Sequence, residues 1–329
     1  MRRHAVSPIR EIWETYSAQR LPPGRTAVYT YRHLAKLKET RRAYAEARPS
    51  HVAAWAGTLR LLVAPRKVVL CYPTRPKPYA VLHKLCALAG YWVTTDPEAP
   101  CDAVVRWHDA TQSDLGPFPH EEAAINRHCT DIRKQHVSRV FADVFGYDLL
   151  VDPTTYVGRV VKKSDENATH DGTVIDCPIP ADEVAPGYVY QKAVDNRRDD
   201  ADGFYEYRVP ILGPTIPVVY IKYRPADAQF KAFDGVDIVP PEAVLSEDER
   251  ERIVAFARAL GMEYGEMDVL RDREDGRVYV VDANDTPSGP SRGFRPEQSV
   301  EALRALRPTF EALLAESARR LAATGKPVP

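Results

Sequence analysis

Residues 265–290 read GEMDVLRDREDGRVYVVDANDTPSGP, and this stretch decides how the rest of the chain is interpreted. Apolar and acidic side chains are mixed at 266–270 and again at 278–284, which predicts two neighbouring strands. The sequence Glu-Asp-Gly at 274–276 is a turn signal between them. The stretch therefore predicts a β-hairpin.

The register of this hairpin brings oxygen-bearing side chains together. With a three-residue loop Asp268 faces Asp282 across the ladder, whereas a two-residue loop shifts the pairing by one residue. Two opposed like charges destabilise a ladder, and a divalent cation removes the repulsion. Asn284 shares a face with Asp282 because strand side chains alternate. Oxygen-only ligands suit Mg²⁺, so Asp268, Asp282 and Asn284 form a candidate metal site; the alternative is a solvated hairpin face.

The composition excludes several classes of protein. The chain has 329 residues, of which 44% are apolar, enough for a large core and two domains. Its 45 basic and 46 acidic residues give no overall basic footprint for nucleic acid. No apolar run reaches the roughly 18 residues of a membrane span, and no secretory signal is recognisable. The five cysteines form no C-x-x-C pair and predict free thiols in a reducing compartment. We expect a cytoplasmic protein that contacts neither nucleic acid nor membrane.

The chain divides into three parts. Residues 1–66 are rich in helix formers and predict a helical N-terminal segment. Residues 67–125 follow a strand–helix–strand order that predicts a small, mostly parallel α/β sheet without a dinucleotide fingerprint. Residues 126–329 predict a larger α+β domain with antiparallel strands.

Three helices are expected in the larger domain. One covers 126–145 and ends at Gly146, and a second follows the capping box at 246–249. The third is amphipathic over 297–323, where Pro308 is expected to break or kink it.

A second candidate for ligand binding is a strand followed by a polar loop. Lys162 ends an apolar strand, where a lysine is a point charge suited to a phosphate. Small polar residues of the loop at 164–172, such as Ser164 and Asn167, let backbone N–H groups approach phosphate oxygens. The loop is not a Walker P-loop, and an ordinary long hairpin is the alternative.

Two further strand regions have ligand-binding and structural interpretations. The strand at 188–195 would present its backbone edge to a purine, although a plain edge strand fits equally. Arg208, Lys222 and Arg224 would line a trough for phosphates or a carboxylate. The alternative for the trough is the wet outer face of an antiparallel sheet.

The order of these elements resembles the ATP-grasp superfamily of carboxylate–amine ligases, which includes D-alanine–D-alanine ligase and glutathione synthetase. The resemblance covers about residues 126–290 and implies an ATP-grasp fold, preceded by a small Rossmann-like domain at 67–125 and the helical segment 1–66. The family's metal motif is an acidic residue on one strand and acidic-x-Asn on the next, which here corresponds to Asp268 and 282–284. The family usually has Glu where Asp282 stands.

The resemblance implies ATP and Mg²⁺ as cofactors and gives the other residues roles. It implies that Lys134 and Lys162 contact the nucleotide phosphates and that the 164–172 loop closes over the γ-phosphate. It implies an adenine-binding hinge formed by Gln191, Ala193 and Val194, with Lys192 nearby, while Asp195 stands at the ribose position and Arg208 matches an arginine that touches phosphate or acyl phosphate.

The implied reaction is ATP-dependent formation of an amide bond between a small-molecule carboxylate and an amine. The carboxylate attacks the γ-phosphate to form an acyl phosphate, which the amine or a similar nucleophile then displaces, with release of ADP and phosphate. Such a reaction requires positioning and charge stabilisation but no protein nucleophile. Arg208 and the backbone N–H groups of Ser288 and Gly289 are candidates for contacts to the acyl phosphate and the oxyanion.

Two other functions remain open. A kinase on the same scaffold needs a base, for which His108 with Asp109, or His170, are candidates. A non-catalytic nucleotide-binding protein is the third possibility. Arg75, Lys77 and His108 lie on predicted loops at strand ends, where substrates commonly bind. Residues 1–66 would cap the cleft or form a contact in a homodimer.

Overall fold

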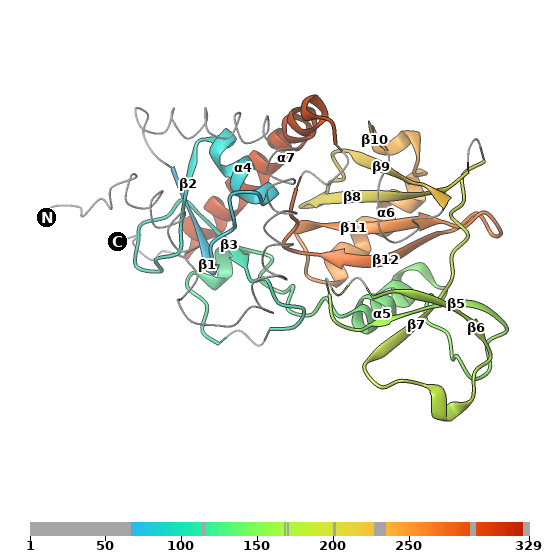
Figure 1. The fold of residues 1–329 in the computed structure, drawn as a ribbon. Coiled ribbons are helices and arrows are strands. Elements are labelled where there is room, and N and C mark those ends of the chain that lie inside the picture. Colours follow the sequence, from blue (N-terminus) through green and yellow to red (C-terminus); the bar gives the residue numbers. More distant parts are fainter. Residues whose placement is uncertain are drawn as a thin grey trace, which may run out of the picture.

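The computed structural model describes residues 67–113, 116–167, 169, 171–199, 202–226, 235–289 and 294–324. The predicted helical segment 1–66 and the candidate base His170 lie outside the described residues. Three sheets organise the described part of the chain, and they follow one another along the sequence (Figure 1). No helix in this part is both long and apolar enough to cross a membrane.

The first sheet is parallel, as the sequence predicts. Its strand order is β2-β1-β3-β4, and all three pairings are parallel. The helix between β1 and β2 ends at Gly90, whose φ of 82° is the left-handed conformation that glycine adopts without strain. That this unit corresponds to the domain preceding ATP-grasp domains stays a prediction. The elements are β1 (Lys67–Pro73), α4 (Val81–Ala89), β2 (Tyr91–Thr94), β3 (Ala103–Trp107), the short helix η1 (Glu121–Ala123) and β4 (Ala124–Ile125).

The largest sheet is antiparallel and has five strands in the order β10-β9-β8-β11-β12. Two helices, α5 and α6, pack on one of its faces, and Figure 1 shows α6 behind the sheet and α5 beside the edge strand β12. The second helix begins with the predicted capping box, in which Ser246 and Glu249 bond each other's backbone N–H. The elements are α5 (Lys134–Phe145), β8 (Phe204–Leu212), β9 (Val219–Arg224), β10 (Gly235–Val239), η4 (Pro241–Ala243), α6 (Glu247–Ala259), β11 (Tyr264–Arg271) and β12 (Val278–Asn284).

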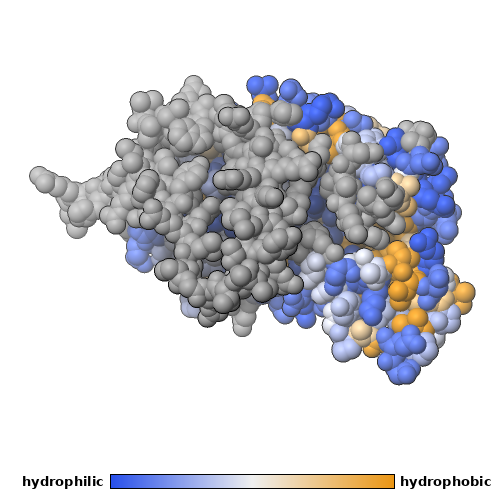
Figure 2. Space-filling model, viewed as in Figure 1, coloured by the Kyte–Doolittle hydropathy of each residue, from blue (hydrophilic) through white to orange (hydrophobic). Residues whose placement is uncertain are grey.

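A smaller sheet of three strands lies beside the edge strand β12 (Figure 1). It comprises β5 (Gly158–Ser164), β6 (Thr173–Cys177) and β7 (Tyr188–Lys192), with β5 in the middle and the short helix η2 (Ala181–Glu183) before β7. Apolar residues gather on the surface over this part of the molecule (Figure 2). Val157, for example, is 83% exposed.

The start of α5 differs from the prediction of a helix over 126–145. The structure begins this helix at Lys134. Asn126 instead adopts a φ of 63° and is buried, and its side chain bonds the backbone of Glu263 and Tyr264 at 2.7–2.8 Å. A side chain that bonds distant backbone groups in this way competes with helix formation. The predicted end at Gly146 is confirmed.

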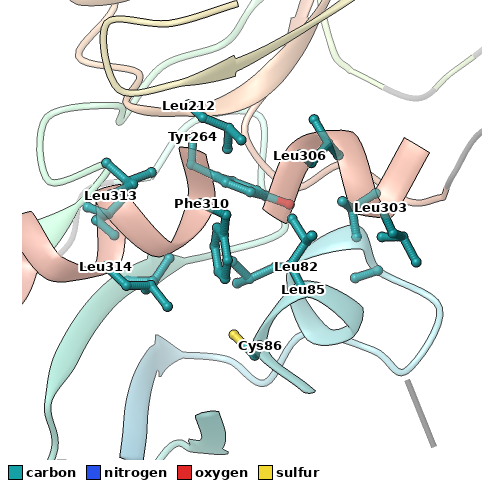
Figure 3. Packing of buried hydrophobic residues seen from close by; sticks show 14 of the residues in the cluster. Leu82, Leu85, Cys86, Leu212, Tyr264, Leu303, Leu306, Phe310, Leu313 and Leu314 are labelled. Atoms are coloured by element: carbon teal, nitrogen blue, oxygen red, sulfur yellow. The ribbon is translucent and has the colours of Figure 1, made fainter. Parts of the chain in front are cut away.

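The C-terminal helix α7 (Pro296–Ala323) joins the first sheet to the five-stranded sheet. Figure 3 shows its apolar side chains between α4 and the ends of β8 and β11. The helix runs through Pro308, so the predicted break is wrong, and the alternative of a kink at this residue stays a prediction. Pro308 lies on the exposed side, where water can satisfy the carbonyl that loses its partner. The buried side of α7 comprises Leu303, Leu306, Phe310, Leu313 and Leu314.

Candidate functional site

The two faces of the five-stranded sheet differ in chemistry because side chains alternate along each strand. One face is apolar and packs on Phe141 of α5 and Phe256 of α6. The other face is apolar only at the end that α7 covers, and it is charged in the middle of the sheet. The residues of this charged face are Glu206, Arg208, Lys222, Arg224, Glu266, Asp268, Asp282 and Asn284.

The hairpin of β11 and β12 places Asp268 opposite Asp282, which confirms the predicted pairing. The loop, however, is not the predicted three-residue loop, because the ladder begins with Arg271 opposite Val278. A register shift between Asp268 and Val269 then brings the two aspartates into line. A β-bulge of this kind adds one residue to one strand and redirects the side chains beyond it.

Arg208 of β8 lies across from the two acidic residues of β11. Its Nη1 is 3.0 Å from Oδ1 of Asp268, and its Nε is 3.5 Å from Oε2 of Glu266. Burial raises the pKa of Asp268, and the neighbouring Glu206 and Asp282 add to that effect while Arg208 opposes it. Burial likewise raises the pKa of Glu266. The arginine therefore holds together carboxylates that would otherwise repel one another.

A second set of charges continues the row toward β9. Glu206 is 2.7 Å from Nζ of Lys222 and 2.8 Å from Nη2 of Arg224. Burial alone would raise the pKa of Glu206, but Lys222, Arg224 and Arg208 lower it to about 2. The predicted trough of Arg208, Lys222 and Arg224 therefore exists as a set of cations that are paired with carboxylates.

The donor set of Asp268, Asp282 and Asn284 fits Mg²⁺. Oδ1 of Asp282 is buried and has no hydrogen-bond partner among the described residues, which is a costly state for a carboxylate. The amide oxygen of Asn284 accepts from the backbone N–H of Thr286 at 2.9 Å, which orients this side chain. No group of three His, Cys, Asp or Glu side chains in the described ranges could hold a metal ion. The candidate set instead has two carboxylates and one amide, and all three donors are oxygens.

The lysine that reaches this group from the small sheet is Lys163. Its Nζ donates to the carbonyl oxygen of Val281 at 2.9 Å, one residue before Asp282. Burial lowers the pKa of Lys163 to about 8, although Asp282 and Asp268 favour its charge. Lys162 points to the opposite face of β5, with its ammonium 4.9 Å from the ring centre of Tyr188. The structure does not bring Lys162 to the carboxylates.

The polar loop after β5 folds against the start of α5. Oδ1 of Asp165 accepts from the backbone N–H of Gln135 at 2.7 Å, and the ammonium of Lys134 donates to the carbonyl of Glu166. The backbone N–H of Asn167 donates to Thr111 Oγ1 at 3.0 Å, in the loop after β3. A carboxylate at the first turn of a helix is favoured by the helix dipole. The loop thus lies between α5 and the first sheet.

Two ties hold the start of that loop. The N–H of Ser164 and the hydroxyl of Thr169 both donate to Oδ1 of Asp171, each at 3.1 Å. Desolvation acts to raise the pKa of Asp171, but these hydrogen bonds hold it below its usual range.

The predicted hinge is engaged in contacts within the protein. Gln191 is buried and donates to Ser138 Oγ at 2.9 Å. The N–H of Lys192 donates to the carbonyl of Leu149, so the outer edge of β7 is paired up to this point. The backbone N–H of Ala193 donates to Arg159, and the Val194 side chain is buried.

The charged residues of the hinge also have partners. Nζ of Lys192 lies 2.7 Å from Asp272 and 3.2 Å from Asp275, in the loop of the β11–β12 hairpin. Asp195 pairs with Arg197 at 2.5 Å, and this hydrogen-bonded pair holds the pKa of Asp195 below its usual range. Lys192 therefore connects the hinge to the hairpin loop.

Ser288 and Gly289 lie beside the first sheet. Ser288 forms a β-bridge with Ala80, and the N–H of Gly289 donates to the carbonyl of Tyr79 at 3.2 Å. That contact engages the Gly289 N–H within the protein.

The predicted substrate loops lie at the carboxyl ends of β1 and β3. Lys77 is exposed and lies 3.9 Å from Asp109, whereas Nδ1 of His108 is buried without a hydrogen-bond partner among the described residues. Arg75 lies on the same loop as Lys77. The structure places these residues at the edge of the first sheet where ligands bind in open α/β folds.

Three functional candidates were missed by sequence reasoning. Lys163 had a signal, since it is the next lysine along the strand and has the opposite orientation to Lys162. Glu206 and Glu266 also had one, because both alternate with the cationic and acidic residues already singled out on β8 and β11. Their pairing with cations depends on strand order, which the sequence does not reveal.

Comparison of sequences gives no relative for this chain. No protein-family model matches it, and no curated protein matches it either.

Comparison of structures gives several ATP-grasp ligases, the family that the sequence resembles. D-alanine–D-alanine ligase from Bacillus anthracis is 14% identical at a TM-score of 0.49, over 80% of this chain and all of that one. The ATP-grasp ligase PsnB, complexed with its minimal precursor, is 15% identical at a TM-score of 0.48, over 77% of this chain and 98% of that one. The macrocyclase MdnC from Microcystis aeruginosa MRC, bound with its precursor peptide MdnA, is 12% identical at 0.41, over 76% and 99%.

These likenesses are distant in both sequence and structure. The assignment of function below therefore depends on the charges and contacts of this chain.

Proposed function

We propose that this protein is an ATP-dependent ligase that joins a carboxylate to an amine through an acyl phosphate, with Mg·ATP bound between the five-stranded sheet and the small sheet. The observation that carries the proposal is the pair of opposed aspartates, Asp268 and Asp282, faced by Lys163 from the other sheet. Two carboxylates with a buried orphan oxygen beside a lysine form a site for a metal ion and a polyphosphate together.

The phosphates would be held by cations from two directions. We assign this role to Lys163 and Lys134, because each ammonium lies within the region between the polar loop and β12. Lys163 takes the role predicted for Lys162, since Lys162 points to the opposite face of its strand. Asp268, Asp282 and Asn284 would hold Mg²⁺. When bound, the ion would neutralise charge on the phosphate oxygens.

The remaining assignments are part of the same proposal. The hinge residues Gln191 to Val194 would bind adenine, and any backbone hydrogen bonds to the base fall to residues after Lys192, since the edge of β7 is paired up to there. Asp195 would contact the ribose. Ser164 and Asn167 belong to the loop that would cover the γ-phosphate, and Lys222 would attract the phosphates from β9 while remaining paired with Glu206.

The proposed reaction has two steps. A carboxylate oxygen of the substrate forms a bond to the γ-phosphorus, and the bond from that phosphorus to ADP breaks, with ADP taking the electron pair. The amine nitrogen then bonds to the carbonyl carbon of the acyl phosphate and the carbon–oxygen bond breaks. Phosphate leaves with the electron pair of that bond and takes up the proton that the amine gives up. Arg208 would stabilise the negative charge of the transferring phosphoryl group, because it is the cation nearest to Asp268. The backbone N–H of Ser288 would face the oxyanion, because the N–H of Gly289 donates to the carbonyl of Tyr79.

The test is release of ADP and phosphate from Mg·ATP in the presence of pooled amino acids and small acids, with Asp282→Ala as the blank. The proposal expects one phosphate per ADP and transfer of ¹⁸O from labelled carboxylate into the phosphate. A phosphorylated product without free phosphate would establish a kinase instead. Binding of Mg·ATP without any ADP formation across the pools would establish a non-catalytic nucleotide-binding protein.

A further inference from the structure

The five residues that follow β12, the strand of Asp282 and Asn284, are held against the first sheet. This 285–289 segment runs beside the residues that lead into α4. The N–H of Val81 donates to the carbonyl of Pro287 at 3.3 Å, and the N–H of Gly289 donates to the carbonyl of Tyr79 at 3.2 Å. The segment therefore connects the candidate metal site to a different sheet.

A buried arginine meets the beginning of this segment. Arg106, near the end of β3, is 2% exposed, and its Nη1 lies 3.3 Å from Oδ2 of Asp285. The same guanidinium donates to the carbonyl of Cys129 and the hydroxyl of Ser113. Four separate parts of the chain, including β3 itself, thus meet at the guanidinium of Arg106, and one of them begins with Asp285, the residue directly after Asn284.

A buried lysine meets the end of the segment. Lys84 of α4 is fully buried, and its ammonium donates to the carbonyl of Gly289. Both ends of the 285–289 segment are therefore held by buried side chains that belong to the first sheet and its helix.

Holding a segment in this way is costly. Removing a guanidinium and a carboxylate from water takes several kcal/mol per ion, and well-packed apolar residues often serve stability equally well. Nε of Arg106 and Oδ1 of Asp285 also lack hydrogen-bond partners among the described residues. Stability alone does not account for such a pair. What a guanidinium offers that an apolar side chain lacks is a rigid fork of donors with fixed directions.

We propose that Arg106 is a positioning residue that acts through Asp285 to fix the Ser288–Gly289 backbone relative to the loops of the first sheet. The role rests on the proposed function, because it concerns the geometry of the reacting groups. Asp268, Asp282 and Asn284 are all held by the ladder of β11 and β12 in any case. We call the ion pair of Arg106 and Asp285 the clamp. Loss of the clamp should therefore spare nucleotide binding and lower the rate of the chemical step.

The test compares Arg106→Met, Arg106→Lys, Asp285→Asn and the Arg106→Met/Asp285→Asn double variant in the full chain. Calorimetry with a non-hydrolysable ATP analogue and Mg²⁺ gives the fraction of competent molecules and the affinity. Turnover is measured as ADP release with the pooled amino acids and small acids. We expect kcat per binding site to fall about 100-fold in Arg106→Met, the loss that a misplacement of about 1 Å produces. The dissociation constant should stay within about threefold. Because the two residues act together, the double variant should be no slower than the slower single variant.

Hydrogen exchange provides a readout that does not depend on activity. Amides of the 285–289 segment should exchange at least about tenfold faster in Arg106→Met than in the wild type. Arg106→Lys, which keeps the charge but not the fork, should lie between the two. If Arg106→Met yields no folded protein, Asp285→Asn decides the matter by the same measurements.

The matched control is Arg271→Met. Arg271 also pairs with a carboxylate, Glu249 at 2.8 Å, and with a carbonyl, but it lies toward α6. Its loss should lower the melting temperature without changing kcat per site. An unchanged kcat and unchanged exchange in the Arg106 and Asp285 variants would overturn the proposal, as would an equal loss of kcat in the control. A wild type that binds no Mg-nucleotide would overturn the proposed function instead, while the exchange experiment would still decide whether the clamp exists.

Discussion

The two faces of the five-stranded sheet come from the same strands but have opposite chemistry. On one face Val209, Met267 and Val280 are fully buried against α5 and α6. On the other, residues one position away on the same strands are ionised groups such as Arg208 and Asp268. Burial of apolar area accounts for the first face. The second gains little from burial, since each charge there requires a partner to offset its desolvation.

The difference separates stability from function. The helix-covered face holds the sheet together, whereas the charged face presents groups whose arrangement stability does not require. Substitutions on the two faces should accordingly change different measurements.

The largest expected effect is on the charged face. Asp282→Ala should lower turnover of Mg·ATP by about 1,000-fold or more, because charge stabilisation of several kcal/mol is lost and each 1.36 kcal/mol is tenfold. The fold should persist, since the substitution removes one of two opposed negative charges. ADP release and a thermal melt measure the two effects. Full activity in this variant would remove the metal assignment.

The matching change on the apolar face is Phe256→Ala. Phe256 is fully buried between α6 and the sheet, so its loss should lower the free energy of unfolding by about 3–5 kcal/mol. The affinity of the folded fraction for Mg·ATP should not change. Urea denaturation and calorimetry check the pair of results. A selective loss of nucleotide affinity would contradict the separation of the two faces.

Two adjacent lysines of the small sheet, Lys162 and Lys163, allow a second comparison of opposite faces. Lys163→Met should weaken binding of Mg·ATP about 10- to 100-fold, the value of a charge-assisted hydrogen bond of about 1.5–3 kcal/mol. Lys162→Met, its neighbour on the opposite face, serves as the matched control and should change the affinity less than about threefold. Equal losses, or a greater loss in Lys162→Met, would reverse the assignment.

The smallest effect expected is a pH dependence. Because burial lowers the pKa of Lys163 to about 8, half of the lysines have lost their charge near pH 8, and the rest lose it as the pH rises further. Affinity for Mg·ATP should fall above pH 8, by at most about tenfold per pH unit. Lys163→Arg keeps its charge and should flatten the profile. The contribution of Lys163 to stability has the opposite sign: the penalty for burying the ammonium is relieved between pH 8 and 10.5, the ordinary value.

Local sequence patterns were informative wherever one segment determined the outcome. The pairing of Asp268 with Asp282 was predictable because both strands and their turn lie within 20 residues. The bulge that produces this pairing was not, since it compensates for a loop length that the turn signal does not specify. A strand pattern predicts that Lys162 and Lys163 point to opposite faces, but it does not predict which of the two faces meets the second sheet.

Contacts between distant segments could not be predicted. Arg106 and Asp285 are separated by 179 positions, and Lys84 and Gly289 by 205. In the sequence Arg106 is a polar residue within an apolar strand, Lys84 one within a helix and Asp285 one within a loop, and none of the three stands out. The helix continues through Pro308 for a related reason. Packing of α7 on α4 and the first sheet, which the local sequence does not reveal, outweighs the cost of a proline on the exposed side.

The most direct test of the central claim is calorimetric titration of a non-hydrolysable ATP analogue into the wild type and into Asp282→Ala, each with and without Mg²⁺. The account predicts one site per chain in the wild type with affinity that depends on Mg²⁺, and loss of that dependence in Asp282→Ala. A wild type that binds no nucleotide, or a variant with an unchanged dependence on Mg²⁺, would contradict it.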